Sequence, residues 1–182
     1  MKVIETDIPG VLVFEPVVHG DERGYFMETY RADFFAEYGV PGPFVQDNQS
    51  SSGRGVLRGL HYQIRHPQGK LVRVVAGRVF DVAVDLRRSS PTCGRWTGVE
   101  LSAENRRQFW VPPGFGHGFL VLSEQAEFFY KCTDYYAPEH ERVIRFDDPD
   151  LGIDWPVSSD MTIVVSDKDR QGSAFSGAEL FP

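Results

Sequence analysis

The sequence predicts an all-β protein: a double-stranded β-helix (a cupin-like jelly roll) with a few short helices, forming a single domain over residues 1–182. Three observations lead to this fold class. Short apolar or alternating segments recur along the chain, turns drawn from its 18 glycines and 12 prolines separate them, and one segment alone has a convincing helical pattern. Alternating strand–helix units are missing, which argues against a Rossmann fold or a TIM barrel.

The N-terminal quarter is expected to form two strands and the one clear helix. Residues 11–16 and 25–30 have the composition of strands, and the polar segment 19–24 between them has the composition of a turn. Residues 31–38 follow a helical pattern that Gly39 ends.

The remainder of the chain is expected to be a series of strands. They are predicted at residues 44–50, 57–63, 71–76, 79–85, 96–101, 108–111, 119–122 and 126–133. Between them we expect a loop at 50–55 and a rigid Pro- and Gly-rich loop at 112–118.

Composition limits the functions that this chain can have. Its 182 residues suit one domain with a sizeable core, and its net charge of -7 argues against broad nucleic-acid binding. Cys93 and Cys132 are too few for a disulfide framework, so a reducing cytoplasm is the expected location. The N-terminus has no apolar signal core, and no apolar run is long enough to span a membrane, so we expect no membrane association.

The most informative stretch is the predicted strand 57–63 with the polar turn that follows it. Alternation places His61 on the face opposite the apolar one, and Arg58 and Lys70 lie close in sequence. Histidine can accept a proton near neutral pH, and the arginine fork suits phosphate. Together they indicate a site for an anionic substrate that loses a proton. Taken alone, His61 is better explained as a structural hydrogen-bonding residue.

Other residues could complete such a site. A carboxylate could orient the His61 ring, and a tyrosine could donate a proton from the opposite face. The candidate carboxylates are Asp81, Asp85, Asp167 and Asp169, and the candidate tyrosines are Tyr130, Tyr135 and Tyr136. Lys70 could stabilise an oxyanion, and the candidate phosphate-binding groups are Arg23, Arg58 and Lys168. The alternative is that the tyrosines are core residues and that the charged groups are only solvated.

A metal site is not predicted. The usual cupin pattern has two histidines one residue apart, then a glutamate and a distant histidine. Here Tyr62 and Gln63 follow His61, and no second histidine stands at that spacing. His61 and His117 alone are too few ligands.

Seven segments, taken in order, resemble the dTDP-4-dehydrorhamnose 3,5-epimerase family nearly end to end. They are residues 21–26 (DERGYF), 44–48 (FVQDN), 57–63 (LRGLHYQ), 68–73 (QGKLVR), 79–85 (VFDVAVD), 110–119 (WVPPGFGHGF) and 166–169 (SDKD). The resemblance implies a homodimeric jelly roll that needs neither metal nor organic cofactor. The implied reaction converts dTDP-4-dehydro-6-deoxy-α-D-glucose into dTDP-4-dehydro-β-L-rhamnose by proton transfer at C3 and C5, beside the C4 ketone.

The resemblance also implies roles for individual residues. His61 would be the base, Asp169 its dyad partner, Tyr130 the proton donor and Lys70 the group that stabilises the enolate oxygen, while His117 would contact the sugar. The implied nucleotide-sugar contacts are Arg23, Glu28, Gln46, Asp47, Asn48, Arg58, Glu141 and Lys168, with the arginines on the diphosphate, and Phe26 and Tyr136 near the thymine. In such dimers the N-terminal strand crosses to the partner, which would then share in the site.

Three other functions compete with this one. A single-carbon (3- or 5-) epimerase or isomerase of a dTDP-keto-deoxysugar would share the site and differ in product. A sugar-binding jelly roll would not need the base, the acid and the lysine. A metal-dependent cupin oxygenase would need the missing ligands.

Overall fold

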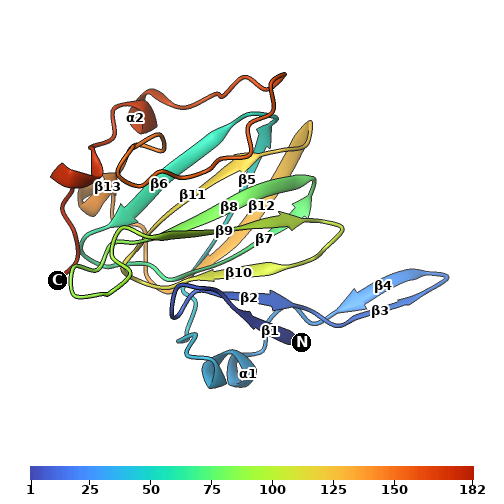
Figure 1. The fold of residues 1–182 in the computed structure, drawn as a ribbon. Helices are drawn as coiled ribbons and strands as arrows, with labels where there is room; N and C mark the ends of the chain where they lie inside the picture. Colours follow the sequence, from blue (N-terminus) through green and yellow to red (C-terminus); the bar gives the residue numbers. More distant parts are fainter.

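Two antiparallel sheets face each other in the computed structural model, which describes residues 1–182 (Figure 1). The six-stranded sheet has the order β1 (Lys2–Glu5), β2 (Leu12–Glu15), β10 (Gln108–Val111), β7 (Lys70–Ala76), β12 (Gln125–Cys132) and β5 (Gln46–Gly53). The five-stranded sheet has the order β13 (Glu141–Val143), β6 (Leu57–Gln63), β11 (Phe115–Val121), β8 (Arg78–Asp85) and β9 (Trp96–Ser102). This arrangement confirms the predicted all-β jelly roll.

The main core lies between the two sheets, at one end of the sandwich. Val74 of β7 and Phe109 of β10 belong to one buried cluster with Ala83 of β8. Inward positions alternate along each strand, so Val74 shares a face of β7 with Lys70. That face changes from charged to apolar within one strand, and the charged end is left to line a cavity.

The N-terminal elements cover the outer face of the six-stranded sheet. Phe35 of α1 (Ala32–Glu37) packs on Phe14 of β2 with ring centroids 4.4 Å apart. The strands β3 (Val18–Asp21) and β4 (Gly24–Met27) pair only with each other and form a hairpin, here called the arm, that projects away from the sheets (Figure 1).

The C-terminal segment lies along the five-stranded sheet. Trp155 packs edge-on against Phe80 of β8. The helix α2 (Asp167–Arg170) lies beside β6, and the short 3-10 helices η1 (Pro138–His140) and η2 (Phe175–Gly177) lie in connecting segments. None of the helices is both long enough and apolar enough to span a membrane.

Most predicted strands are present, and the differences concern their ends. The strand β5 continues through Gly53, where a loop was expected from residue 50, and β4 ends at Met27 instead of at residue 30. The loop predicted at 112–118 is wrong in its second half, because β11 begins at Phe115. Glycine there serves close strand packing, since a Cβ on Gly118 would lie 2.7 Å from the Arg58 carbonyl oxygen. The strands β1, β3 and β13 were not predicted, and β3 occupies the start of the segment 19–24 that was expected to be a turn.

Candidate active site

A cavity of about 230 Å³ opens between the two sheets at their polar end. Its lining residues are Ser50, Arg58, His61, Lys70, His117, Gly118, Phe119, Phe128, Tyr130, Tyr136, Glu141 and Lys168. Eight of these had been selected from the sequence: Arg58, His61, Lys70, His117, Tyr130, Tyr136, Glu141 and Lys168. The fold therefore brings these eight residues together from both sheets and from α2, although Arg58 and Lys168 are 110 positions apart.

His61 is hydrogen-bonded to a buried carboxylate. Its Nε2 lies 2.6 Å from Oδ1 of Asp169, whose side chain is only 3% exposed. The other carboxylate oxygen accepts a hydrogen bond from the backbone N–H of Gly59 at 3.3 Å. Burial raises the pKa of Asp169, but its hydrogen bonds, above all the one with His61, outweigh burial and leave this pKa below its ordinary value. An ionised Asp169 can orient the imidazole and stabilise its protonated form.

A second histidine–carboxylate pair stands next to the first. His117 of β11 is directly opposite His61 in the strand register, and its Nε2 lies 2.9 Å from Oδ1 of Asp81. Both side chains are buried, and burial raises the pKa of Asp81. Asp81 was a candidate partner of His61, and the structure places it on His117 instead. The available signal in the sequence was the position of Asp81 inside the apolar run of β8, because a buried charged side chain needs a specific partner.

Lys70 and Tyr130 approach the cavity from the six-stranded sheet, while His61 approaches from the five-stranded one. Burial lowers the pKa of Lys70. Burial also raises the pKa of Tyr130 to about 12, so its phenol carries its proton at neutral pH. The cavity thus has a histidine on one sheet and a protonated phenol and a lysine on the other.

The mouth of the cavity carries an aromatic ring and three charged side chains. Tyr136 is 51% exposed, and its hydroxyl donates to Glu141 Oε2 at 3.1 Å. Glu141 in turn pairs with Lys168 Nζ at 2.9 Å. Arg58 is held by Ser52 Oγ, which its guanidinium contacts at 3.0 Å.

Gln46 and Asn48 lie on the inner face of β5 near this mouth, without lining the cavity. Gln46 Oε1 accepts the backbone N–H of Tyr136 at 2.9 Å, and Gln46 Nε2 donates to Asn48 Oδ1 at 3.1 Å. Asp47 points to the other face of the sheet because strand residues alternate, and there it pairs with Lys131 at 2.9 Å.

Three residues selected from the sequence stand apart from the cavity of their own chain. Arg23 and Phe26 belong to the arm, and Glu28 follows it. Phe26 is 71% exposed. The Arg23 side chain forms hydrogen bonds only with Asp21, two positions before it. Glu28 lies 3.8 Å from Arg31.

Sequence reasoning missed four of the lining residues: Ser50, Gly118, Phe119 and Phe128. Their neighbours in the strands gave the available signal, because Phe128 shares a face of β12 with Tyr130. No group of three or more His, Cys, Asp or Glu side chains is arranged to hold a metal ion.

Comparison with known proteins gives the relatives of this chain. The family model described as dTDP-4-dehydrorhamnose 3,5-epimerase matches residues 5–177. The dTDP-4-dehydrorhamnose 3,5-epimerase of Pseudomonas aeruginosa is 61% identical over the whole of both chains.

Solved structures agree with this assignment. A dTDP-6-deoxy-D-glucose-3,5-epimerase from Legionella pneumophila, in complex with dTDP-4-keto-L-rhamnose, is 52% identical with a TM-score of 0.94 over 98% of this chain and 94% of the other. ChmJ, a 3'-monoepimerase from Streptomyces bikiniensis in complex with dTDP-quinovose, is 39% identical with a TM-score of 0.88 over 94% of this chain and 86% of the other. Matched almost end to end by the family model and by a relative at 61% identity, the chain belongs to the dTDP-4-dehydrorhamnose 3,5-epimerase family of isomerases.

Proposed function

We propose that this enzyme inverts C3 and C5 of dTDP-4-dehydro-6-deoxy-D-glucose and releases dTDP-4-dehydro-L-rhamnose, a step of dTDP-L-rhamnose biosynthesis. The observation that carries the proposal is one cavity lined by His61, Lys70 and Tyr130, with Asp169 bonded to His61 behind it. The ligand of the Legionella pneumophila relative, dTDP-4-keto-L-rhamnose, agrees with this substrate class.

The first chemical step is proton removal. The C4 ketone acidifies the hydrogens on C3 and C5, and His61 takes one of them as the general base. The electron pair of the broken C–H bond moves into the enolate, whose negative charge gathers on the C4 oxygen. Asp169 stabilises the imidazolium, and the Lys70 ammonium stabilises the enolate oxygen.

The second step is proton return from the opposite face. Tyr130 faces the cavity from the other sheet and carries its proton at neutral pH. Transfer of that proton to the enolate carbon re-forms the ketone with inverted configuration. Exchange with solvent then removes the proton from His61 and restores one to Tyr130, so that the second carbon can react.

The nucleotide would bind at the mouth of the cavity. Arg58 and Lys168 would contact the diphosphate, for which the arginine fork is well suited. The exposed ring of Tyr136 would stack on the thymine.

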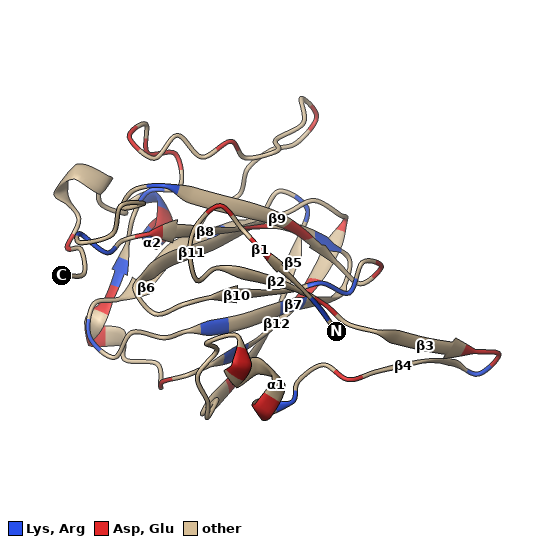
Figure 2. Cartoon of the chain, turned by 60° about the horizontal axis from the view of Figure 1, so that its bottom comes forward, with Lys and Arg blue, Asp and Glu red and all other residues tan.

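We propose a homodimer in which the arm reaches the partner's cavity. Tyr25 and Phe26 are 60% and 71% exposed, although large aromatic side chains gain most from burial. Along the strands of the arm, Figure 2 shows charge only at the tip. A hairpin that carries two exposed rings and is charged only at its tip is suited to packing against a second copy. It would bring Arg23, Phe26 and Glu28 to the other chain's nucleotide.

The proposed reaction uses no metal and no organic cofactor. Both histidines of the cavity have one ring nitrogen engaged by a carboxylate, which suits proton transfer. We propose a cytoplasmic location because both cysteines are unpaired, as is usual in a reducing compartment.

A single-carbon epimerase is the second candidate, and the similarity to the 3'-monoepimerase ChmJ favours it. The product separates the two. The enzyme is incubated with dTDP-4-dehydro-6-deoxyglucose and an NADPH-dependent 4-keto-sugar reductase, and the reduced sugar is analysed. We expect dTDP-L-rhamnose. A sugar inverted at one carbon would establish the single-carbon activity, and the unchanged D-gluco configuration would contradict both.

A further inference from the structure

The loop that carries Tyr136 has almost no hydrogen bonds from the backbone of other segments. Residues 134–137 connect β12 to η1, and their backbone makes one hydrogen bond with other backbone groups, from the His140 N–H to the Ala137 carbonyl at 3.0 Å. Tyr136 itself is 51% exposed. A segment with few backbone bonds and an exposed side chain depends on other groups for a fixed position.

Gln63 bonds the loop on both sides of Tyr136. Its Oε1 accepts the backbone N–H of Ala137 at 2.9 Å, and its Nε2 donates to the Tyr135 carbonyl at 3.2 Å and to the His66 carbonyl at 2.7 Å. The Gln63 side chain is buried, with the residue 5% exposed. Both amide hydrogens and the amide oxygen are therefore used, and two of the three bonds hold the loop.

Two further glutamines complete the set. Gln68 Nε2 donates to the Asp134 carbonyl at 2.8 Å, and Gln46 Oε1 accepts the Tyr136 N–H at 2.9 Å. Each of the four residues 134–137 thus has one backbone group bonded by a glutamine side chain. These side chains come from β5, β6 and the turn before β7, so they tie the loop to both sheets.

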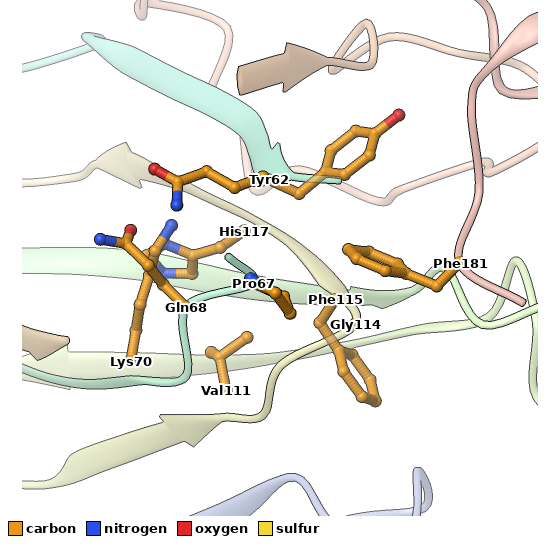
Figure 3. A pocket seen from close by; sticks show the side chains of 10 residues that line it. Tyr62, Pro67, Gln68, Lys70, Val111, Gly114, Phe115, His117 and Phe181 are labelled. Atoms are coloured by element: carbon orange, nitrogen blue, oxygen red, sulfur yellow. The ribbon is translucent and has the colours of Figure 1, made fainter. Parts of the chain in front are cut away.

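The same glutamines also border a second, smaller cavity. Gln63 and Gln68 line it together with Lys70 and His117, and its space of about 10 Å³ suits about one water molecule. Figure 3 shows Gln68, Lys70 and His117 at one end of this cavity and Phe115 and Phe181 at the other. Gln63 and Gln68 could therefore act on the loop or on Lys70, and these two roles have different kinetic consequences.

We propose that Gln63 and Gln68 are positioning residues for nucleotide binding: by bonding the backbone around Tyr136, they hold its ring where it receives the base of the nucleotide. The proposal rests on the proposed function, because it takes the Tyr136 ring as the stacking group. Gln63 and Gln68 make three hydrogen bonds to the loop, and neither of them makes a hydrogen bond to Lys70. Their effect is therefore expected in affinity, not in the chemical step.

Gln63→Leu and Gln68→Leu test this, with Gln125→Leu as the control. Gln125 is an exposed residue that bonds the Ser51 hydroxyl at 2.7 Å, and it lies outside both cavities. KM and kcat are measured with the dTDP-keto-sugar, and the Kd of dTDP by titration calorimetry. Gln63→Leu removes two hydrogen bonds to the loop and should raise KM and Kd together by about 10-fold or more. Gln68→Leu removes one hydrogen bond to the loop and should raise both by about 3-fold. The kcat should stay within about 2-fold of the wild-type value.

A double-mutant cycle shows whether the effect passes through the ring. In a Tyr136→Ala background, Gln63→Leu should change the Kd of dTDP by less than about 2-fold, because the ring it positions is gone. The same loss in both backgrounds would overturn the proposal. So would a fall in kcat with KM and Kd unchanged, which would place the action on Lys70. If circular dichroism shows that Gln63→Leu is unfolded, Gln68→Leu decides the matter alone.

The proposed function fails by a different result. Wild-type protein that binds dTDP without turning over the keto-sugar would contradict the epimerase, while the dTDP affinities of the variants would still test the glutamines.

Discussion

The Nε2 atom of His61 lies 2.6 Å from the Asp169 carboxylate, although the two residues are 108 positions apart in the chain. His61 stands on β6, and Asp169 stands on α2, which Ser166 begins by accepting the Asp169 N–H at 3.1 Å. The C-terminal segment therefore brings an ionised group to a strand of the other half of the chain. A histidine oriented by a buried carboxylate is well suited to the proposed proton abstraction next to a ketone.

Asp169→Asn should lower kcat on the order of 100-fold or more with a small change in KM. The amide keeps the shape of the side chain but lacks the charge that stabilises the imidazolium. Steady-state kinetics measure this, with Asp167→Asn as the control because Asp167 is an exposed residue of the same helix. Wild-type kcat in Asp169→Asn would remove the carboxylate from the mechanism.

Tyr130→Phe should separate proton removal from inversion. The variant keeps the ring and loses only the proton donor. Hydrogen exchange at the sugar should therefore continue, while the rate of formation of the inverted product should fall by about 100-fold or more. NMR of the reaction mixture follows both. Tyr135→Phe is the matched control, since Tyr135 is 65% exposed and lies outside the cavity. Inversion at the wild-type rate in Tyr130→Phe would assign the donor to another group or to water.

Lys70 should set an alkaline limit on kcat. Burial lowers the pKa of Lys70, so its ammonium loses the proton, and with it the charge that stabilises the enolate, at a pH below the ordinary lysine value of about 10.4. The kcat of the wild-type enzyme should therefore fall as pH rises through that range. Tyr130, with a pKa of about 12, stays protonated there.

The variant Lys70→Arg keeps a positive charge throughout this range, so its alkaline limb should move to higher pH even if its kcat is lower. Lys131→Arg, on the outer face of the sheet, should leave the profile unchanged. An alkaline limb at the same pH in wild type and Lys70→Arg would show that another group titrates.

Mixing two defective variants tests the exchange of arms in the proposed dimer. His61→Ala lacks the base, and Phe26→Ala lacks the aromatic contact from the arm. If each arm serves the partner's cavity, a mixed dimer has one complete site, and random mixing restores about a quarter of wild-type activity. Turnover is measured after unfolding and refolding the mixture. No gain over the average of the two separate variants would show that each arm serves its own chain or none.

The fold class was predictable because alternation and turn residues repeat along the chain. The same rules failed where a residue has a tertiary role. Gly118 is typical of a loop, but it lies in β11, where the backbone of β6 passes too close for a side chain. The strands β1, β3 and β13, of four, four and three residues, were missed because such short segments give only a weak period.

The site was predictable as a set of residues and not as a set of contacts. Spacing could not choose among four carboxylates for His61, and only the folded chain separates Asp169 from Asp81, which bonds His117. The pairing depends on how α2 and β8 lie against β6 and β11, and local sequence carries little of that information. The glutamine bonds around Tyr136 were invisible for the same reason, since they join side chains to a loop without secondary structure.

Hydrogen exchange at the sugar in heavy water tests directly whether His61 is the base of this enzyme. Wild-type protein and His61→Asn are incubated with dTDP-4-dehydro-6-deoxyglucose in deuterium oxide, and NMR follows C3 and C5. Wild type should introduce deuterium at both carbons, and His61→Asn should slow this exchange by about 100-fold or more. Exchange at both carbons at the wild-type rate in His61→Asn would contradict the assignment of His61 as the base, and no exchange with wild type would contradict the epimerase itself.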